Sequence, residues 1–525
     1  MAPTSFTYDF SDSLLGFKGK STFSTGLFLD GKFVDSVQAG ETTDLVNPAN
    51  GKHLCSVTVG CEKDVDIAVE CAQRAFDNSW GIKTSGQQRG RLLLRLATLM
   101  NENIDELVAL EALNSGKTYN RAYGDVVGAA SVIRYYGGWA DKIHGKTLEV
   151  DDSVFAYTRM EPFGVVGQIV PWCAYPIGMM SWKLGPALAT GNTIVFKPSE
   201  WTPLTALRVA TLIVEAGFPP GVVNIVNGYG NVVGAAISSH MGIEKVAFTG
   251  STLVGRRIMK AAAESNLKKV TVELGGKSPT LVLDDCDLEA AAKWAAFGII
   301  FNHGQTCCAG SRVFVQENVF DKFMEKFTAA MKAVKVGDPL HPETTQGPQV
   351  SEVHFKRVMN YIDLGKKEGA TCYLGGERHG VEGFFIQPTI FTDVTSDMTI
   401  MKEEIFGPVI VVSKFRDDEE LVKLANDTLY GLAAGIFSQN ISRAIGLANK
   451  IRAGTVWINM YNILHPNVPF GGYKQSGFGR ELGEYALENY TQVKAVLANL
   501  TGPPRSEVVW VLDSVSFNIS PDPLS

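Results

Sequence analysis

Two adjacent cysteines in a polar loop are the side chains best suited to nucleophilic chemistry. The loop, residues 302–310, has the sequence Asn-His-Gly-Gln-Thr-Cys-Cys-Ala-Gly and directly follows an apolar helical stretch, so a rigid scaffold would present it. A thiolate at Cys307 could attack a carbonyl carbon. The alternative role for such a cysteine is a small buried apolar residue, because free cysteine is among the most buried residue types.

A second motif, residues 272–279, supplies a carboxylate. Its sequence is Val-Glu-Leu-Gly-Gly-Lys-Ser-Pro, in which Glu273 ends an expected strand and two glycines let the chain pass close to a ligand. Glu273 is therefore a candidate general base. A single glutamate is more often solvated or salt-bridged, so this motif and the cysteine loop support catalysis mainly in combination.

Alternating strands and helices must position these motifs. Apolar segments predict strands at 164–171, 193–197, 222–226, 245–248 and 269–273, and apolar spacing predicts helices at 64–80 and 85–104. The alternation predicts right-handed βαβ units and a parallel sheet. Such sheets bind ligands beyond the carboxyl ends of their strands, where Lys197, Thr249 and Glu273 fall. A second alternating series, 279–458, predicts another α/β domain facing the first across a cleft.

The composition excludes several classes of protein. A chain of 525 residues exceeds one ordinary core, and 45% hydrophobic with 20% charged residues is typical of globular proteins. A net charge of -7 gives no broad basic field, so no nucleic-acid partner is expected. No segment reaches the roughly 20 apolar residues that span a bilayer, so no membrane association is expected either.

The number of cysteines and the composition of the amino-terminal segment indicate the cellular compartment in which the protein is expected. Eight cysteines are sparse for this length and lack the spacing of a disulfide scaffold or a zinc site, so free thiols and no metal are expected. Residues 1–30 contain Asp9 and Asp12 and no long apolar run, unlike a secretory signal or transit peptide. We therefore expect the cytoplasm.

Both motifs resemble signature regions of the aldehyde dehydrogenase superfamily. The matching segments are VTVELGGKSP at 270–279 and GQTCC at 304–308, and the segments 196–200, 248–252, 404–408 and 469–477 resemble further family motifs in the expected order. The similarity covers about residues 27–500. It implies an α/β fold similar to the general cytosolic aldehyde dehydrogenases, with two Rossmann-like parallel-sheet domains, cofactor and catalytic, plus a small β oligomerisation flap.

The resemblance also implies domain boundaries. The NAD-binding domain would comprise 24–143 and 163–275, the catalytic domain 276–475, and the oligomerisation strands 144–162 and 488–500. Pairing through these strands would make a dimer or a tetramer. Residues 501–525, with prolines near both ends, are expected to form a C-terminal appendage.

The chemistry implied by the resemblance is oxidation of an aldehyde to the carboxylic acid with NAD. Cys307 would attack the aldehyde to form a thiohemiacetal, oxidation would give a thioester, and Glu273 would activate the water that hydrolyses it. Glu273 favours release to water over the alternative, transfer of the acyl group to CoA.

Further residues are assigned to the cofactor by the same resemblance. Glu200 accepts hydrogen bonds from ribose hydroxyls but repels a 2′-phosphate, so NAD is favoured over NADP, although Lys197 could partly accommodate the phosphate. Ser251 begins a helix whose amino end could receive the pyrophosphate. The full cofactor-binding set is Trp172, Lys197, Glu200, Gly250, Ser251, Gly255, Glu404 and Phe406.

The aldehyde tunnel is expected to be apolar. The resemblance places Met179, Trp182, Leu464 and Phe470 along it, although each is more often an ordinary core residue. This set suits aliphatic or aromatic aldehydes and lacks an arginine that would indicate an anionic substrate.

The chain departs from the family pattern next to Trp172. The family has Pro-Trp-Asn, and its asparagine amide helps to bind the developing oxyanion, whereas this chain has Pro171-Trp172-Cys173-Ala174. Loss of one oxyanion donor costs about 3–4 kcal/mol of transition-state stabilisation. Cys173 would be a catalytic position in a weakened enzyme that uses another donor. The alternatives are a catalytically inactive, cofactor-binding or structural family member, or a sequence error at this point.

Overall fold

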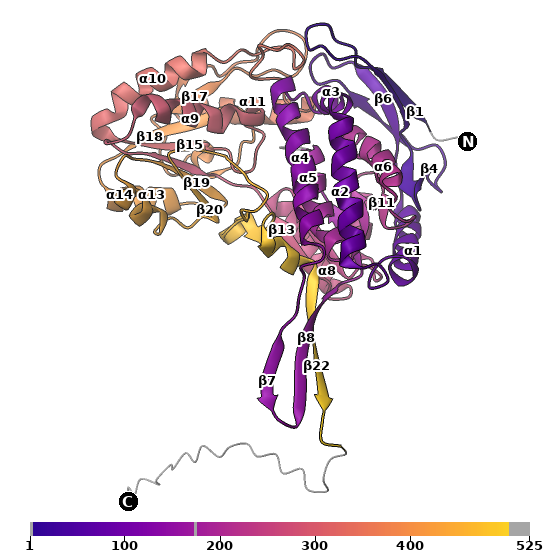
Figure 1. Cartoon of the computed structure of the whole chain (residues 1–525). Coiled ribbons are helices and arrows are strands. Elements are labelled where there is room, and N and C mark those ends of the chain that lie inside the picture. The colour runs from indigo at the N-terminus through magenta and orange to yellow at the C-terminus, as the bar shows by residue number, and fades with distance from the viewer. Residues whose placement is uncertain (1–3, 173–175, 503–525) are drawn as a thin grey trace, which may run out of the picture. The chain divides into compact units, whose positions relative to one another are not determined.

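The computed structural model describes residues 4–172 and 176–502 (Figure 1). The chain divides into two units. The described residues of Met1–Ile143 and Pro162–Gln492 form one compact unit, which contains both large sheets, and those of His144–Glu161 and Val493–Ser525 form the other. None of the helices in the described part of the chain combines the length and apolarity that a membrane crossing requires.

The first large sheet has eight strands in the order β21-β13-β12-β9-β10-β11-β3-β4. The strands are β3 (Leu27–Leu29), β4 (Lys32–Val34), β9 (Val165–Ile169), β10 (Thr193–Lys197), β11 (Val223–Ile225), β12 (Lys245–Thr249), β13 (Lys269–Glu273) and β21 (Gly477–Phe478). The five strands from β9 to β13 pair in parallel with one another, whereas β3 pairs antiparallel with β11 and β21 pairs antiparallel with β13. Every residue of β9, β10 and β12 is buried, as expected where helices cover both faces.

The strand order creates a switch point between β9 and β12. The chain runs outward from β9 through β10 to β11, then returns to the other side of β9 to form β12 and β13. The connections after β9 and β12 therefore leave the sheet in opposite directions. Such a position is where open parallel sheets bind their ligands.

Helices cover this sheet: α1 (Glu62–Asn78), α2 (Gly86–Glu102), α3 (Ile104–Ser115), α4 (Tyr119–Trp139), α5 (Pro176–Ala189), α6 (Leu204–Ala216), α7 (Ala235–Ser239) and α8 (Thr252–Glu264). The helices α2, α4 and α5 pack side by side (Figure 1). Ser85 caps α2 by accepting a hydrogen bond from the Gln88 N–H, and α3 ends at Gly116 with φ of 77°, a conformation that favours glycine. Every residue of α5 is buried, including Lys183.

The second large sheet has seven strands in the order β16-β17-β18-β15-β14-β19-β20. They are β14 (Pro279–Val282), β15 (Arg312–Gln316), β16 (Thr371–Leu374), β17 (Thr389–Thr392), β18 (Val409–Phe415), β19 (Ala433–Phe437) and β20 (Thr455–Ile458). All neighbours pair in parallel except β16 and β17.

Helices on both faces of the second sheet bury alternate strand residues in separate cores. Val313 and Val315 pack with α9 (Leu288–Ile300) and α10 (Phe320–Lys332). Phe314 packs with α11 (Glu352–Lys367), α13 (Asp418–Asn426) and α14 (Ile441–Ala448). Figure 1 shows α13 and α14 on the opposite side of the sheet from α9 and α10. This alternation follows from the two-residue period of a strand.

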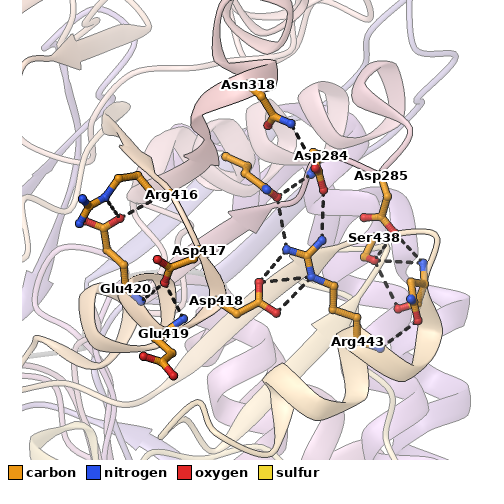
Figure 2. Close-up of polar contacts among 12 residues, drawn as sticks. Asp284, Asp285, Asn318, Arg416, Asp417, Asp418, Glu419, Glu420, Ser438 and Arg443 are labelled. Atoms are coloured by element: carbon orange, nitrogen blue, oxygen red, sulfur yellow. Dashed lines mark hydrogen bonds and ion pairs between the residues drawn. The ribbon is translucent and has the colours of Figure 1, made fainter.

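A polar network covers the carboxyl ends of three central strands of the second sheet (Figure 2). Arg443 of α14 binds Asp284, which follows β14, at 3.1 Å, and Asp418 of α13 at 2.6 Å. It also donates to Gln316, the last residue of β15. Ser438, after β19, donates to Asp285 at 2.8 Å. These contacts occupy one edge of the sheet.

Two smaller hairpins complete the large unit. They are β1 (Ser5–Asp9) with β2 (Lys20–Ser24) and β5 (Thr42–Val46) with β6 (His53–Thr58). The smaller unit contains most of a three-stranded sheet of β7 (Thr147–Asp151), β8 (Val154–Pro162) and β22 (Thr491–Asn499), in the order β22-β8-β7. Exposed apolar side chains on these strands are Leu148, Val150, Phe155, Val493 and Leu497.

The α/β class and most predicted elements agree with the structure. The bounds of β10 and β13 match the predicted strands at 193–197 and 269–273, and the other three predicted strands overlap β9, β11 and β12. Two expected boundaries differ. β21 joins the first sheet from residues beyond 275, and the last strand begins at Thr491, because a 3-10 helix at Glu484–Asn489 occupies the start of the predicted 488–500 segment.

Candidate active site

The carboxyl edge of the first sheet and the amino edge of the second sheet contribute to the candidate active site. Glu273 is the last residue of β13, at the carboxyl edge of the first sheet. In the second sheet the residues lie before their strands: Cys307 precedes β15, and Glu404 and Phe406 precede β18. The amino edge of the second sheet therefore supplies these residues, while its carboxyl edge carries the Arg443 network.

Cys307 and Glu273 meet at this site. Their Sγ and Oε1 atoms are 3.9 Å apart, within sulfur hydrogen-bond distance. Glu273 is 3% exposed, and burial raises its pKa to about 7. Its other oxygen, Oε2, is buried and has no hydrogen-bond partner among the described residues. A carboxylate in this state can accept a proton near neutral pH.

The two glycines of the motif 272–279 allow close approach of other site residues. A Cβ on Gly275 would lie 2.1 Å from the carboxylate of Glu404, and a Cβ on Gly276 would lie 2.4 Å from the carbonyl oxygen of Cys307. The Gly276 N–H also donates to Glu404 Oε1 at 3.0 Å. A larger residue at Gly275 would displace the Glu404 side chain, and one at Gly276 would displace the backbone of the cysteine loop.

The loop before Cys307 has a constrained backbone. Asn302 and His303 have φ of 49° and 60°, a left-handed conformation that is uncommon outside glycine. The Asn302 amide donates to the Gln305 carbonyl at 2.8 Å, and the Gln305 side chain accepts from the Val350 N–H. Burial lowers the pKa of His303 to about 3, so its neutral ring accepts from the Gly347 N–H. These bonds hold the loop that presents Cys307.

Two ionisable residues that the sequence did not single out lie beside Glu273. Lys183 of α5 donates to Thr249 Oγ1 at 2.8 Å and pairs with Glu481. Its side chain is 0% exposed and that of Glu481 is 8% exposed. The positive charge of Lys183 lowers the pKa of Glu273, and the negative charge of Glu481 raises it. A lysine within the otherwise apolar segment 176–189 was the available signal, since buried polar residues are informative.

Lys197 and Glu200 lie just beyond the carboxyl end of β10. Lys197 Nζ donates to the Pro198 carbonyl at 2.9 Å and pairs with Glu200 at 3.3 Å. Burial lowers the pKa of Lys197, while the Glu200 side chain keeps 33% of its surface exposed. An accessible carboxylate beside a lysine has the donor and acceptor chemistry that ribose hydroxyls require.

The turn after β12 begins helix α8 at the switch point. Ser251 caps α8, and its Oγ accepts from the Val254 N–H at 3.4 Å. A Cβ on Gly255 would lie 2.8 Å from Leu274, so glycine lets the helix pack against the end of β13. At Gly250 the neighbour at 2.5 Å is the Phe248 ring. Helix amino ends favour bound anions, which fits a pyrophosphate here.

An aromatic cluster joins the two edges. The Trp172 ring, after β9, lies 5.4 Å from the Phe406 ring and 4.8 Å from His354. His354 in turn bonds the Phe406 carbonyl at 2.6 Å. Phe406 has φ of 65°, an unusual value for a bulky residue. Beside it, burial raises the pKa of the Glu404 carboxyl to about 7.

A cavity of about 510 Å³ approaches the site between α4 and α9. Trp182 and Leu464, two of the residues assigned to the aldehyde tunnel from the sequence, line it. Met179 and Phe470 are buried and do not line it, although Phe470 packs edge-on against Trp182 at 5.8 Å. Arg121, which is not among the residues assigned to the aldehyde tunnel from the sequence, also lines this cavity. The helical position of Arg121, four residues before Asp125, gave no sign of this.

The predicted catalytic position Cys173 lies outside the described residues, as does its neighbour Ala174. In the part of the chain that the structure describes, no group of histidine, cysteine and acidic residues has the arrangement of a metal site. Of the remaining predicted residues, the structure brings together Cys307 with Glu273, Trp172 with Phe406, and Lys197 with Glu200.

Comparison with known proteins gives the family. A model of the aldehyde dehydrogenase family matches residues 33–496. The chain belongs to this family. It is 58% identical over 499 residues to an aldehyde dehydrogenase of Agaricus bisporus, with 95% of this chain and 99% of the relative covered. It is 50% identical over 479 residues to human aldehyde dehydrogenase 1A1, with 91% and 95% covered.

Solved structures agree with this membership. The NAD+ complex of an aldehyde dehydrogenase from Bacillus cereus has a TM-score of 0.89 and 51% sequence identity, with 90% of this chain and 96% of that chain covered. A betaine aldehyde dehydrogenase from Staphylococcus aureus has a TM-score of 0.90 at 40% identity, with 93% and 96% covered. The chain is therefore an enzyme of the aldehyde dehydrogenase family with two Rossmann-like domains.

Proposed function

We propose that this aldehyde dehydrogenase oxidises its substrate through a covalent intermediate on Cys307 and hydrolyses the resulting thioester with Glu273 as general base. The contact of 3.9 Å between Sγ and Oε1 carries the proposal. It joins a nucleophile from the second sheet to a base from the first. Nearby oxygens and sulfur at this separation can exchange a proton directly or through one water.

The residues divide the work between two half-reactions. In the first, the Cys307 thiolate bonds to the aldehyde carbon, and the carbonyl oxygen becomes a thiohemiacetal oxyanion. When bound, NAD would supply the hydride acceptor that allows this adduct to become a thioester. In the second, Glu273 takes a proton from a water, the hydroxide adds to the thioester carbon, and the thiolate of Cys307 leaves.

The residues at the carboxyl edge of the first sheet fit a dinucleotide. Lys197 and Glu200 would hold the adenosine ribose, and the amino end of α8 at Ser251, next to Gly250 and Gly255, would receive the pyrophosphate. Glu404, with Phe406 and Trp172 beside it, would hold the second ribose. The Glu200 carboxylate favours NAD over NADP, because the nearby Lys197 charge is already paired with it at 3.3 Å.

Oxyanion binding is the step on which this chain differs from its family. The family asparagine is replaced by Cys173-Ala174. Exchanging these two residues for one asparagine is expected to raise turnover by roughly 100- to 1,000-fold, the effect of one oxyanion donor. An unchanged rate would mean that another donor already performs this role.

Single-turnover kinetics test the proposed mechanism. Cys307→Ala should form no NADH on mixing with NAD and aldehyde, whereas Glu273→Gln should give a burst of NADH and then slow steady turnover. Cys372→Ala, which changes a cysteine of β16 remote from the site, is the matched control and should behave as wild type. A Cys307→Ala enzyme that turns over normally would exclude the mechanism.

We also propose self-association through the three-stranded sheet β22-β8-β7. The exposed apolar residues Leu148, Val150 and Phe155 support this, because an uncovered sheet with such side chains favours pairing. Sedimentation should find dimers or tetramers, and Phe155→Glu should shift them toward monomers. The proposed compartment is the cytoplasm, where a catalytic thiol stays reduced; cell fractionation tests it.

A further inference from the structure

The cavity beside α4 and α9 is lined by exposed residues at one end and by buried residues at the other. Its walls include the exposed residues Asn120, Gly124 and His465 and the buried residues Trp182 and Asn462. At the buried end, Asn462 Oδ1 accepts a hydrogen bond from Cys308 Sγ at 3.0 Å. Cys308 adjoins the proposed nucleophile, so the cavity leads from the surface toward the reaction site.

Arg121 lies on the cavity wall next to the exposed end. Its guanidinium carbon is 4.7 Å from the centre of the Phe297 ring and 5.2 Å from that of Phe301. Both rings also line the cavity. The two phenylalanines belong to α9 and the short helix that follows it, one helical turn apart. Both rings pack against the guanidinium and attract its positive charge.

Among the described residues the Arg121 guanidinium has no hydrogen-bond acceptor and no ion-pair partner within 4.0 Å, and the nearest charge that acts on it is that of Asp125. Arg121 is half-buried, and burial lowers the pKa of its guanidinium. A guanidinium has five N–H donors. A partly buried guanidinium without protein acceptors loses hydration energy that a ligand carboxylate would restore.

The acidic residues closest to Arg121 along the chain bind other partners. Asp125, one turn along α4, forms an ion pair with Lys117, and the two side chains are 8% and 1% exposed. Glu111 is buried and accepts a hydrogen bond from Thr205 at 2.8 Å. Burial raises the pKa of Asp125 to about 7 and also raises that of Glu111. Asp125 interacts electrostatically with Arg121 but is ion-paired with Lys117, so the N–H donors of Arg121 remain available to a ligand.

We propose, on the basis of the aldehyde oxidation set out above, that Arg121 selects aldehydes that carry a carboxylate at the end remote from the reacting carbonyl. The carboxylate accepts two parallel hydrogen bonds from the guanidinium, while the aldehyde carbon reaches Cys307. Phe297, Phe301, Trp182 and Leu464 contact the hydrocarbon between the two ends. Arginine suits this role because its planar donors match the two oxygens of a carboxylate.

The alternative role for Arg121 is purely structural. The guanidinium would then only stack on Phe297 and Phe301 and fasten α4 to α9. Replacing it would change stability and lower the activity toward all aldehydes in the same proportion. The two roles therefore differ in selectivity between charged and uncharged substrates.

Matched substrate pairs provide the test. An ω-oxo carboxylic acid and its methyl ester have the same chain and the same aldehyde but differ in charge. The ratio of kcat/KM for the acid to kcat/KM for the ester is measured with NAD at several chain lengths. Because both substrates use one enzyme preparation, a loss of correctly folded enzyme cancels in this ratio.

The full-length chain is compared with three variants. We expect wild type to prefer the acid, Arg121→Met to lower the acid-to-ester ratio by about 10- to 100-fold, mainly through KM, and Arg121→Lys to give an intermediate ratio. Arg134→Met, an exposed position of the same helix that does not line the cavity, should retain the wild-type ratio.

Two outcomes overturn the proposal. One is a wild-type enzyme that does not prefer the acid at any chain length, and the other is an Arg121→Met ratio equal to that of wild type. If the esters are still oxidised in a Cys307-dependent manner, only the role of Arg121 fails. If neither acids nor esters yield NADH, the proposed aldehyde oxidation fails instead.

Discussion

Cys307 Sγ lies 3.9 Å from Glu273 Oε1, although the two residues are 34 positions apart and are positioned by different sheets. The contact depends on two glycines next to Glu273. Gly276 passes against the Cys307 carbonyl, and Gly275 passes against Glu404. The motif 272–279 therefore supplies a carboxylate, and its glycines leave the space that the cysteine loop needs to lie next to that carboxylate.

The pH dependence of thioester hydrolysis should report Glu273. Burial raises its pKa to about 7. A general base acts in its ionised form, so hydrolysis should slow as pH falls through 7, and at pH 6 only about a tenth of Glu273 would be ionised. Stopped-flow measurement of the slow phase after the NADH burst gives the profile. Glu273→Gln should remove this inflection; an inflection that persists in the variant would assign it to another group.

Lys183 and Glu481 should move this inflection in opposite directions. The charge of Lys183 lowers the pKa of Glu273, and that of Glu481 raises it. Lys183→Met should therefore shift the inflection to higher pH, and Glu481→Gln to lower pH. Shifts of the inflection in the same direction in both variants would contradict this assignment.

The same pair should matter for stability. Lys183→Met leaves Glu481 as a buried carboxylate without its ion pair, which costs about 3–5 kcal/mol of unfolding free energy. Lys183→Met combined with Glu481→Gln should recover part of that loss. Chemical denaturation of the single and double variants measures the difference.

Gly276→Ala should impair catalysis more than stability. The added Cβ meets a backbone oxygen of Cys307 at 2.4 Å, so the cysteine loop must move. A displacement of about 1 Å can cost 100-fold in rate, whereas overpacking of this size costs about 1–3 kcal/mol. Gly138→Ala in α4 is the control, because its Cβ meets nothing within 4 Å. It should stabilise the helix by about 0.5–1 kcal/mol and leave turnover unchanged.

Glu200→Gln should weaken the preference for NAD. The substitution removes the charge that repels a 2′-phosphate and also frees Lys197 from its pair at 3.3 Å. The ratio of kcat/KM for NAD to that for NADP should fall by roughly 10-fold. A ratio that stays constant would mean that another group discriminates between the cofactors.

The sequence predicted the scaffold better than the contacts across it. Continuous apolar strands such as 193–197 and 269–273 are recognisable locally, and the carboxyl edge of the first sheet follows from the βαβ rule. The use of the amino edge of the second sheet does not follow from any local pattern. Cys307 was identifiable from its loop and its family motif, but its distance from Glu273 is a property of the packed sheets.

Lys183 and Arg121 illustrate what local patterns leave out. Both lie in helical segments where a basic residue usually faces water, and only tertiary packing reveals that one meets Glu481 and the other a pair of phenylalanine rings. Asn302 and His303 are similar, because their left-handed backbone depends on partners at 347–350.

The carboxyl edge of the second sheet, which carries Arg443, Asp284 and Ser438, contributes no residue to the proposed reaction (Figure 2). We therefore expect inserted peptides to affect turnover less in the turns that follow β14, β15 and β19 than in the loop that precedes β15, which contains Cys307. The carboxyl edge of the second sheet is therefore the preferred place to attach a label or a second protein to this enzyme.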